Sequence, residues 1–305
     1  MSTLIVILGP TGVGKTAFSL QLAEHFGCPI INADSRQIYR DLPIGTAAPT
    51  ASQIARVPHY FVGTHALDEN YSAAQFRTEA REVLHREFLR RDVMIVSGGA
   101  MLYIDALVRG IDDLPTVSSE VRQLLQGRLQ AEGAEALRAE LRLIDPAYYS
   151  RCDLRNTKRI VHALEIYYQS GHPYSSFLTA PSGISQTDAW HTVLVGLNRP
   201  REELFSRINR RAEEMVEDGL MDECRRVLPF RAENSLNTVG YKEMFQVLDG
   251  AWELPFALAR MQKNTRVYAK KQLTWFKRDT AIHWFHPDRA MEQFLALWPQ
   301  VSGEQ

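Results

Sequence analysis

A glycine-rich segment near the start of the chain has the spacing of a phosphate-binding loop. Residues 9–16 read GPTGVGKT and satisfy the P-loop pattern G-x-x-x-x-G-K-[ST]. In such a loop the glycines let backbone N–H groups turn toward phosphate oxygens, and the following helix adds its partial positive charge. Lys15 supplies a point charge, and Thr16 offers a hydroxyl to Mg²⁺. We therefore expect a polyphosphate site, with Mg²⁺ at Thr16, formed by Gly9, Pro10, Thr11, Gly12, Val13, Gly14, Lys15 and Thr16.

A second candidate for chemistry is Asp34, which follows the apolar segment PIINA at 29–33. Open parallel sheets place ligands at the carboxyl ends of their strands, so this carboxylate should lie near the P-loop. An Asp followed by Ser is ordinarily a helix cap or a turn residue. However, the continuing loop, DSRQIYRDLPIGTAAP, is rich in polar and small residues and has little reason to form a core. Asp34 is therefore a candidate member of the ligand site.

The end of a third apolar strand bears on the kind of phosphate chemistry. A motor-type ATPase ends such a strand with an acidic residue that holds the Mg²⁺ shell. Here VMIV at 93–96 is followed by Ser97, Gly98 and Gly99. These residues favour a close backbone approach to a ligand over metal chemistry.

The segments that position these residues alternate between strand-like and helix-like patterns. Apolar runs at 4–8, 29–33 and 92–99, separated by helix-period segments, predict a parallel sheet flanked by helices. The first helix should begin at Lys15 and end where Gly27 adopts a left-handed conformation. The fold class is thus α/β, with a P-loop NTPase-like core.

The middle of the chain changes character. From 114 to 185 the periodicity is helical, with no convincing strand. Further elements are expected at 192–197 (strand), 201–228, 238–249 and 255–278 (helices) and 282–285 (strand). We expect a discontinuous core formed by 1–113 and 186–305, with an all-helical domain inserted at 114–185.

Composition restricts the class of protein. With 305 residues, 45% of them hydrophobic, the chain can bury a sizeable core. A net charge of −1 argues against a protein that coats nucleic acid non-specifically. No run of about eighteen apolar residues and no leader-like start is present, so we expect a soluble, cytoplasmic protein without a membrane partner.

Positive charge is nevertheless concentrated locally. Seven basic residues and no acidic one lie between Arg260 and Arg278. Helical spacing predicts one face with Lys263, Arg266, Lys270 and Lys277, and an opposite, packed face with Leu258, Met261, Tyr268, Trp275 and Phe276. A helix over 155–168 would place Arg155, Lys158, Arg159 and His162 opposite Ile160, Val161, Leu164 and Tyr168. A solvated face usually mixes charges, so both basic faces are candidate phosphate contacts.

Seven segments, in this order along the chain, resemble the bacterial tRNA dimethylallyltransferases (isopentenyltransferases). They are GPTGVGKT, NADSRQIYRDLPIGTAAP, VPHYFVGT, SGGAMLYIDAL, RNTKRIVHALE, NTVGYKEM and AKKQLTWFKRD. The P-loop is generic, whereas NADSRQIYR with IGTA, and SGGAMLY, are specific to this family among P-loop proteins. The resemblance covers essentially the whole chain.

The resemblance implies a reaction and a set of site residues. The P-loop would hold dimethylallyl diphosphate, helped by Arg211 of the RINRR segment, although spacing alone would place Arg207 and Arg211 on a solvated helix face. Asp34 would be the general base for N6 of an adenine in the tRNA anticodon stem-loop, at position 37, next to the anticodon. The implied tRNA-binding residues are Asp34, Ser35, Arg36, Gln37, Ala100, Lys158, Arg159, Ile160, Val161, His162, Val239, Gly240, Tyr241, Lys242, Glu243 and Met244. At Ala100 the family commonly has Thr, so a hydroxyl contact is lost there.

Two other functions use the same features. A nucleotide or small-molecule kinase would bind ATP through the same loop, with Asp34 as its base and similar helical arginines. The basic helices and the helical insertion favour tRNA. A non-catalytic RNA-binding protein with an anion pocket would leave Asp34 unexplained. We expect a monomer, although the sequence carries no signal for the oligomeric state.

Overall fold

The computed structural model describes residues 2–112, 114–178 and 189–302. The chain divides into two compact units, one formed by Met1–Arg109 with Ile184–Gln305 and the other by Gly110–Gly183. The first boundary falls a few residues before the expected start of the insertion at 114. Within the described ranges, no helix is long and apolar enough to cross a membrane.

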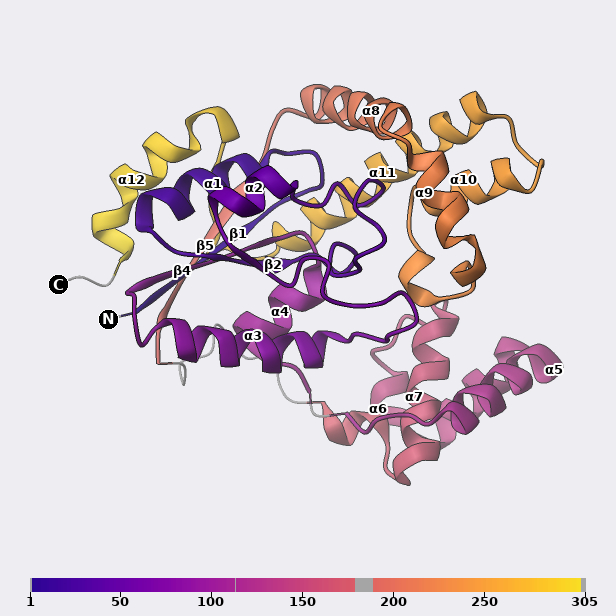
Figure 1. The fold of residues 1–305 in the computed structure, drawn as a ribbon. Helices are drawn as coiled ribbons and strands as arrows, with labels where there is room; N and C mark the ends of the chain where they lie inside the picture. Colours follow the sequence, from indigo (N-terminus) through magenta and orange to yellow (C-terminus); the bar gives the residue numbers. More distant parts are fainter. Residues whose placement is uncertain (1, 113, 179–188, 303–305) are drawn as a thin grey trace. The chain divides into compact units, whose positions relative to one another are not determined.

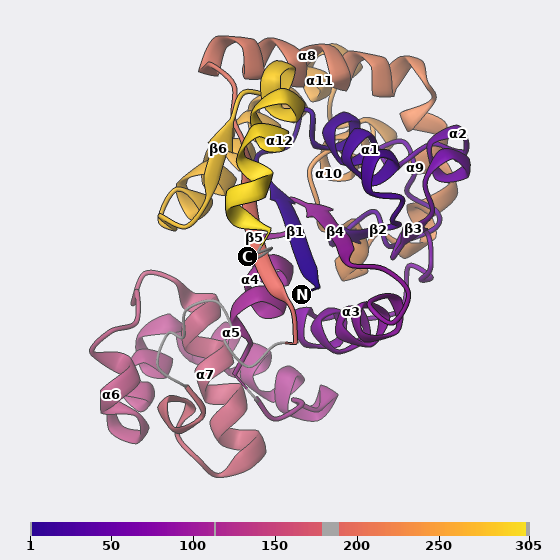
Figure 2. The same ribbon diagram turned by 90° about the vertical axis from the view of Figure 1, so that its left-hand side faces the viewer.

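A parallel sheet forms the centre of the larger unit (Figure 1). Its strands are β1 (Thr3–Leu8), β2 (Ile30–Ala33), β3 (His59–Tyr60), β4 (Val93–Gly98), β5 (His191–Leu197) and β6 (His283–Phe285), in the spatial order β3-β2-β4-β1-β5-β6. Figure 2 shows β1 between β5 and β4. Every residue of β1 and β2 is buried, because helices cover both faces of the sheet. In Figure 1, α1 (Lys15–Phe26) and α12 (Ala290–Val301) lie over one face, and α3 (Ala73–Glu87) and α4 (Met101–Arg109) lie over the other.

The register of the sheet brings the candidate residues to one edge. Leu8 pairs with Gly98 and with Gly196, and Gly98 also pairs with Ala33. The P-loop, Asp34 and the segment after β4 therefore all leave the sheet at the carboxyl ends of neighbouring strands, where ligands bind in open parallel sheets.

In the larger unit, helices are present close to the expected 238–249 and 255–278, whereas the helix expected at 201–228 is broken. As expected, α1 begins at Lys15, and Gly27 caps it in a left-handed conformation, with φ 62°. The single helix expected over 201–228 is wrong, since Gly219, with φ 99°, separates two helices. The remaining helices of this unit are α2 (Ala51–Arg56), α8 (Arg201–Glu217), α9 (Leu220–Val227), α10 (Tyr241–Leu248) and α11 (Leu254–Phe276), with the 3₁₀ turns η2 (Leu228–Phe230), η3 (Asn234–Leu236) and η4 (Pro287–Arg289).

The smaller unit is built from helices. It contains α5 (Ser119–Ile144), α6 (Pro146–Tyr149), α7 (Thr157–Ser170) and the turn η1 (Tyr174–Phe177), and no strand occurs at 110–112 or 114–178. A core of its own includes Leu125, Leu137, Leu141, Ile160 and Leu164. This unit is therefore all-helical, as the periodicity predicts.

The structure of α7 corrects the prediction for 155–168. The Asn156 side chain accepts a hydrogen bond from the Arg159 N–H, so the helix begins at Thr157 and Arg155 lies before it. Tyr168 was expected on the packed face but is 41% exposed. Its hydroxyl donates to Glu140, because this face of α7 is polar where it meets α5.

The basic face of α11 is also partly corrected. The charged groups of Arg266 and Lys270 lie 5.8 and 5.4 Å from the centre of the Phe205 ring on α8. Part of this charge therefore contacts a neighbouring helix. Tyr268, expected to pack in the core, is 38% exposed because its side of α11 faces a cavity. Lys277 lies after the last residue of α11.

Candidate active site

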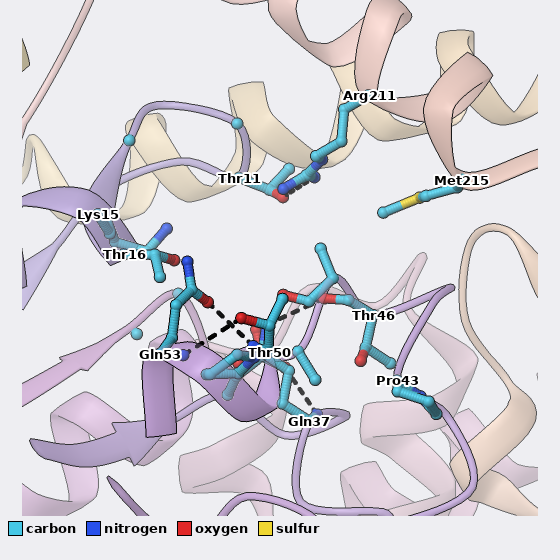
Figure 3. A pocket seen from close by; sticks show the side chains of 18 of the residues that line it. Thr11, Lys15, Thr16, Gln37, Pro43, Thr46, Thr50, Gln53, Arg211 and Met215 are labelled. Carbon is cyan, nitrogen blue, oxygen red and sulfur yellow. Dashed lines mark hydrogen bonds between the residues drawn. The ribbon is translucent and has the colours of Figure 1, made fainter. Parts of the chain in front are cut away.

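The P-loop joins β1 to α1 and lines a cavity of about 730 Å³ (Figure 3). Thr11, Gly12, Gly14, Lys15 and Thr16 face this cavity. The other three loop residues, Gly9, Pro10 and Val13, are buried behind it. Of the eight residues expected to form the phosphate site, five thus line the cavity and three pack behind it.

Lys15 is held against its own loop. Its Nζ donates to the carbonyl oxygens of Gly9, at 2.9 Å, and Pro10, at 3.0 Å. Burial lowers the pKa of Lys15 to about 8, an effect that the Asp34 carboxylate opposes and the Arg211 guanidinium reinforces. Lys15 is therefore a cation that has lost much of its hydration and lies close to a carboxylate.

Asp34 follows β2, where it forms a turn and lies at the cavity. Its Oδ1 accepts hydrogen bonds from the backbone N–H groups of Arg36, at 2.9 Å, and Gln37, at 3.3 Å. It is thus a turn residue, as general preferences suggest. It also lines the P-loop cavity, so the turn aims its carboxylate at the cations there.

Helix α8 supplies two arginines to the same loop. The Arg211 guanidinium donates to Thr11 Oγ1 at 2.5 Å, and Arg207 Nε donates to the Gly12 carbonyl at 3.1 Å. Burial lowers the pKa of Arg211, and Asp34 opposes that shift. Arg210 is exposed and forms an ion pair with Glu214 at 3.2 Å. The expectation of a solvated face is therefore wrong for Arg211, whereas Arg207 is exposed and also contacts the P-loop.

A second cavity, of about 420 Å³, adjoins the first. The residues that line both are Thr11, Asp34, Thr46, Arg211, Met215 and Tyr268. Several residues implied in tRNA binding line only the second: Ser35, Arg36, Ala100, Val239, Lys242 and Glu243. Asp34 thus lies where the P-loop cavity meets one lined by both polar and apolar side chains.

Other residues implied in tRNA binding are internal to the fold. Gly240, Tyr241 and Met244 are buried. Glu243, although it lines the second cavity, accepts hydrogen bonds from the Gly240 N–H at 2.8 Å and from the Asn264 amide at 2.6 Å. These residues shape the cavity wall, while Lys242 remains exposed.

The tRNA-binding segment implied on α7 has two sides. Lys158, Arg159 and His162 are exposed. Ile160 and Val161 are 0% and 9% exposed and pack in the core of the smaller unit. The amphipathic helix turns these two side chains inward, and the implied RNA contacts of Ile160 and Val161 stay a prediction.

Two residues that hydrogen-bond to the P-loop backbone were not predicted from the sequence. Gln272 of α11 is 2% exposed; its Oε1 accepts from the Thr11 N–H at 2.9 Å, and its Nε2 donates to the Gly99 carbonyl at 2.8 Å. Arg199 donates from Nε to the Val13 carbonyl at 2.9 Å. The signal for Gln272 was a polar residue at helical spacing between the buried Ala269 and Phe276.

Ser97 and Gly98, which end β4, and Gly99 line the P-loop cavity, and the two glycines also have a packing role. A Cβ at Gly98 would lie 2.0 Å from the Ala33 carbonyl oxygen, and one at Gly99 would lie 2.5 Å from Gln272 Nε2. The close approach at Gly98 is therefore to β2, and Gly99 makes room for the side chain that ties α11 to the P-loop.

Fold and site together define a P-loop protein in which cations and a carboxylate meet in one cavity. A family model described as IPP transferase matches residues 37–279. The chain is 55% identical over 299 residues to tRNA dimethylallyltransferase 1 of Bacteroides thetaiotaomicron, covering 97% of this chain and 96% of that protein.

Solved structures agree with these sequence matches. A tRNA isopentenylpyrophosphate transferase of Bacillus halodurans is similar with a TM-score of 0.72 and 32% identity, over 99% of this chain and 97% of that one. A eukaryotic dimethylallyltransferase acting on tRNA gives a TM-score of 0.84 and 25% identity, over 98% of this chain and 79% of that one. The chain belongs to the IPP transferase family.

Proposed function

We propose that this protein transfers a dimethylallyl group from dimethylallyl diphosphate to N6 of an adenine in the tRNA anticodon loop, at the position next to the anticodon. The observation that carries the proposal is the position of Asp34, which lines both cavities and lies close to the P-loop cations. The names of the relatives, which are tRNA dimethylallyltransferases, support the same reaction.

The adenine amine needs a base because its lone pair is delocalised into the ring. In the proposed step N6 attacks C1 of the donor, the N6–C1 bond forms, and the C1–O bond breaks, with its electron pair leaving on diphosphate. The N6 proton passes to Asp34. Both turn bonds of Asp34 are made to Oδ1, so we assign the proton to Oδ2.

Negative charge grows on the leaving diphosphate as the C1–O bond breaks. Lys15, Arg211 and the P-loop residues Gly12, Gly14 and Thr16 line the cavity where that charge would develop. Such fixed donors stabilise a transition state because they do not have to reorganise during the reaction.

Mg²⁺ fits this site as an ion shared with the substrate. Mg²⁺ is commonly held by few protein oxygens together with phosphate oxygens and water. The Thr16 hydroxyl lines the cavity and would be the protein ligand, and the ion would neutralise charge on the diphosphate. Among the described residues, the one group of three potential metal ligands is Glu203, His286 and Asp288. Two of these, Glu203 and Asp288, already form ion pairs with Arg199.

One experiment tests the reaction against the kinase alternative. Purified protein is incubated with unmodified tRNA and either labelled dimethylallyl diphosphate or ATP labelled in its terminal phosphate. We expect label from the first donor in tRNA, and no phosphate transfer or rapid release from ATP. Nuclease digestion and mass spectrometry then locate the modified adenine. Rapid ATP consumption without tRNA, or no label in tRNA, would reject the proposal. A monomeric state and a cytoplasmic location are further parts of it.

A further inference from the structure

The larger cavity has a polar end and an apolar end. In Figure 3, Lys15 and Thr16 lie on the left, whereas Met215, Thr46 and Pro43 lie on the right. Other small or apolar residues that line this cavity are Ile44, Ala47 and Ala48. With the diphosphate at the P-loop, the hydrocarbon chain of the donor would extend toward the apolar end.

The loop at that end, residues 43–48, is held by a buried carboxylate. Glu223 of α9 is 0% exposed. Its Oε2 accepts from the Ile44 N–H at 2.8 Å, and its Oε1 accepts from the Gly45 N–H at 2.8 Å and from the Tyr241 hydroxyl at 2.6 Å. A buried charge is tolerated when it is fully hydrogen-bonded, and bonds to a charged acceptor are stronger than neutral ones. Loop 43–48 is thus anchored to the core through α9.

Gln37 holds the other half of the loop. Its Nε2 donates to the carbonyl oxygens of Thr46 and Ala47, both at 3.0 Å. Ala47 has φ 50°, in the left-handed region that non-glycine residues seldom adopt. Gln37 was implied in tRNA binding, but in this structure its amide is committed to the loop. Carboxylate and amide together hold backbone groups of four successive loop residues, so the loop resists outward movement.

The Tyr241 ring packs against loop 43–48 at Gly45. A Cβ at Gly45 would lie 2.6 Å from the Tyr241 ring, so the ring packs directly on the backbone of the loop. Opposite the loop, Met215 projects from α8 and is 7% exposed. This end of the cavity is therefore bounded by a fixed loop on one side and by the flexible side chain of Met215 on the other. Glu214 and Asp218, which are near Met215 in the chain, also line the cavity.

We infer that Met215 and loop 43–48, which Glu223 and Gln37 hold in place, form the end wall of the prenyl site and limit the donor to a short chain. This inference rests on the proposed function and adds a specificity-determining residue to it. Because the loop is fixed by polar contacts, Met215 is the part of the wall whose size can be changed without moving the backbone.

The test compares two donors. Dimethylallyl diphosphate and geranyl diphosphate, which is five carbons longer, are each supplied with saturating unmodified tRNA, and kcat/KM is measured for both. The geranyl reaction makes and breaks the same bonds. One methylene that a pocket must accommodate is worth roughly 10–200-fold in discrimination. Met215→Ala removes three heavy atoms from the wall, so we expect the ratio of geranyl to dimethylallyl kcat/KM to rise at least tenfold.

Matched control variants distinguish a change in the size of the prenyl site from a general loss of protein stability. Met221 is a half-buried methionine of α9 that packs on the core and lines neither cavity, so Met221→Ala should leave the ratio unchanged. Glu223→Gln places an amide N–H against a backbone N–H; it should raise KM for dimethylallyl diphosphate and also raise the geranyl ratio. Glu217→Gln, at an exposed position on α8, is its control.

The results for these variants test the end wall of the prenyl site separately from the proposed function. A folded Met215→Ala protein with an unchanged donor ratio overturns it. If Met215→Ala does not fold, Ala48→Val provides the test. Its larger side chain should narrow the prenyl site and lower kcat/KM for dimethylallyl diphosphate at least tenfold, while tRNA affinity stays the same. An unchanged kcat/KM would overturn the inference. Failure of the unaltered protein to prenylate tRNA at all would instead reject the proposed function.

Discussion

The charge of Lys15 gives the sharpest quantitative prediction. Burial lowers its pKa to about 8, and a diphosphate binds best to the ammonium form. The charged fraction falls from about nine tenths at pH 7 to about one tenth at pH 9, so the affinity of the free protein for dimethylallyl diphosphate should fall about tenfold over this range. The sign follows from the lowered pKa, since affinity is lost as pH rises through about 8. With donor bound, the diphosphate raises the pKa of Lys15, so kcat should fall less.

The assay measures the dissociation constant of dimethylallyl diphosphate for protein without tRNA. Isothermal titration calorimetry at constant Mg²⁺ gives this constant from pH 7 to pH 9. Tyr268 lines the same cavity, but partial loss of hydration raises its pKa to about 12, so it stays protonated throughout. Lys15→Arg keeps its charge and should remove most of the pH dependence. Asp34→Asn removes the carboxylate that opposes the shift, so its decline should begin at lower pH. A flat profile for the unaltered protein, or the same decline in Lys15→Arg, would refute the reasoning.

Three further predictions concern other parts of the site. Asp34→Asn keeps an acceptor for the turn but no base, so single-turnover transfer should fall about 10²–10⁴-fold with tRNA affinity within a few-fold; near-normal turnover would remove Asp34 from catalysis. Gln272→Ala leaves the buried Thr11 N–H and Gly99 carbonyl without their partner, so the free energy of unfolding should fall by about 1–3 kcal/mol. KM for the donor should also rise, and an unchanged midpoint of urea unfolding would contradict this prediction. Replacing Lys158 and Arg159 with Gln should flatten the dependence of log tRNA affinity on log salt by roughly 0.7–0.9 per lost contact, whereas an identical slope would place the RNA elsewhere.

The P-loop and the strand ends could be predicted from sequence because local rules determine them. GPTGVGKT specifies its own backbone conformation, and apolar runs of strand length followed by polar residues identify the edge where ligands bind. The left-handed end of α1 at Gly27 follows equally from residue type. The all-helical insertion was also predictable, since its periodicity lies within single helices.

Helical periodicity gave the direction of a side chain but not its partner. It placed Arg207 and Arg211 on one face of α8, yet only the packed structure puts that face against the P-loop. It also placed Tyr268 on a buried face, because a polar cavity beside α11 leaves no mark on the spacing of apolar residues. The break at Gly219 was missed for a related reason, since the same apolar stripe continues on both sides of it.

The sequence by itself predicted a polyphosphate site, a carboxylate near it and helices with basic faces. Only the tertiary structure decided that Gln272 ties α11 to the P-loop, that Glu223 holds the loop at residues 43–48 and that Gln37 faces inward. These bonds join residues far apart in the chain, where no local pattern connects donor to acceptor. A buried polar group must find a partner, and which partner it finds depends on the order of strands and helices in space.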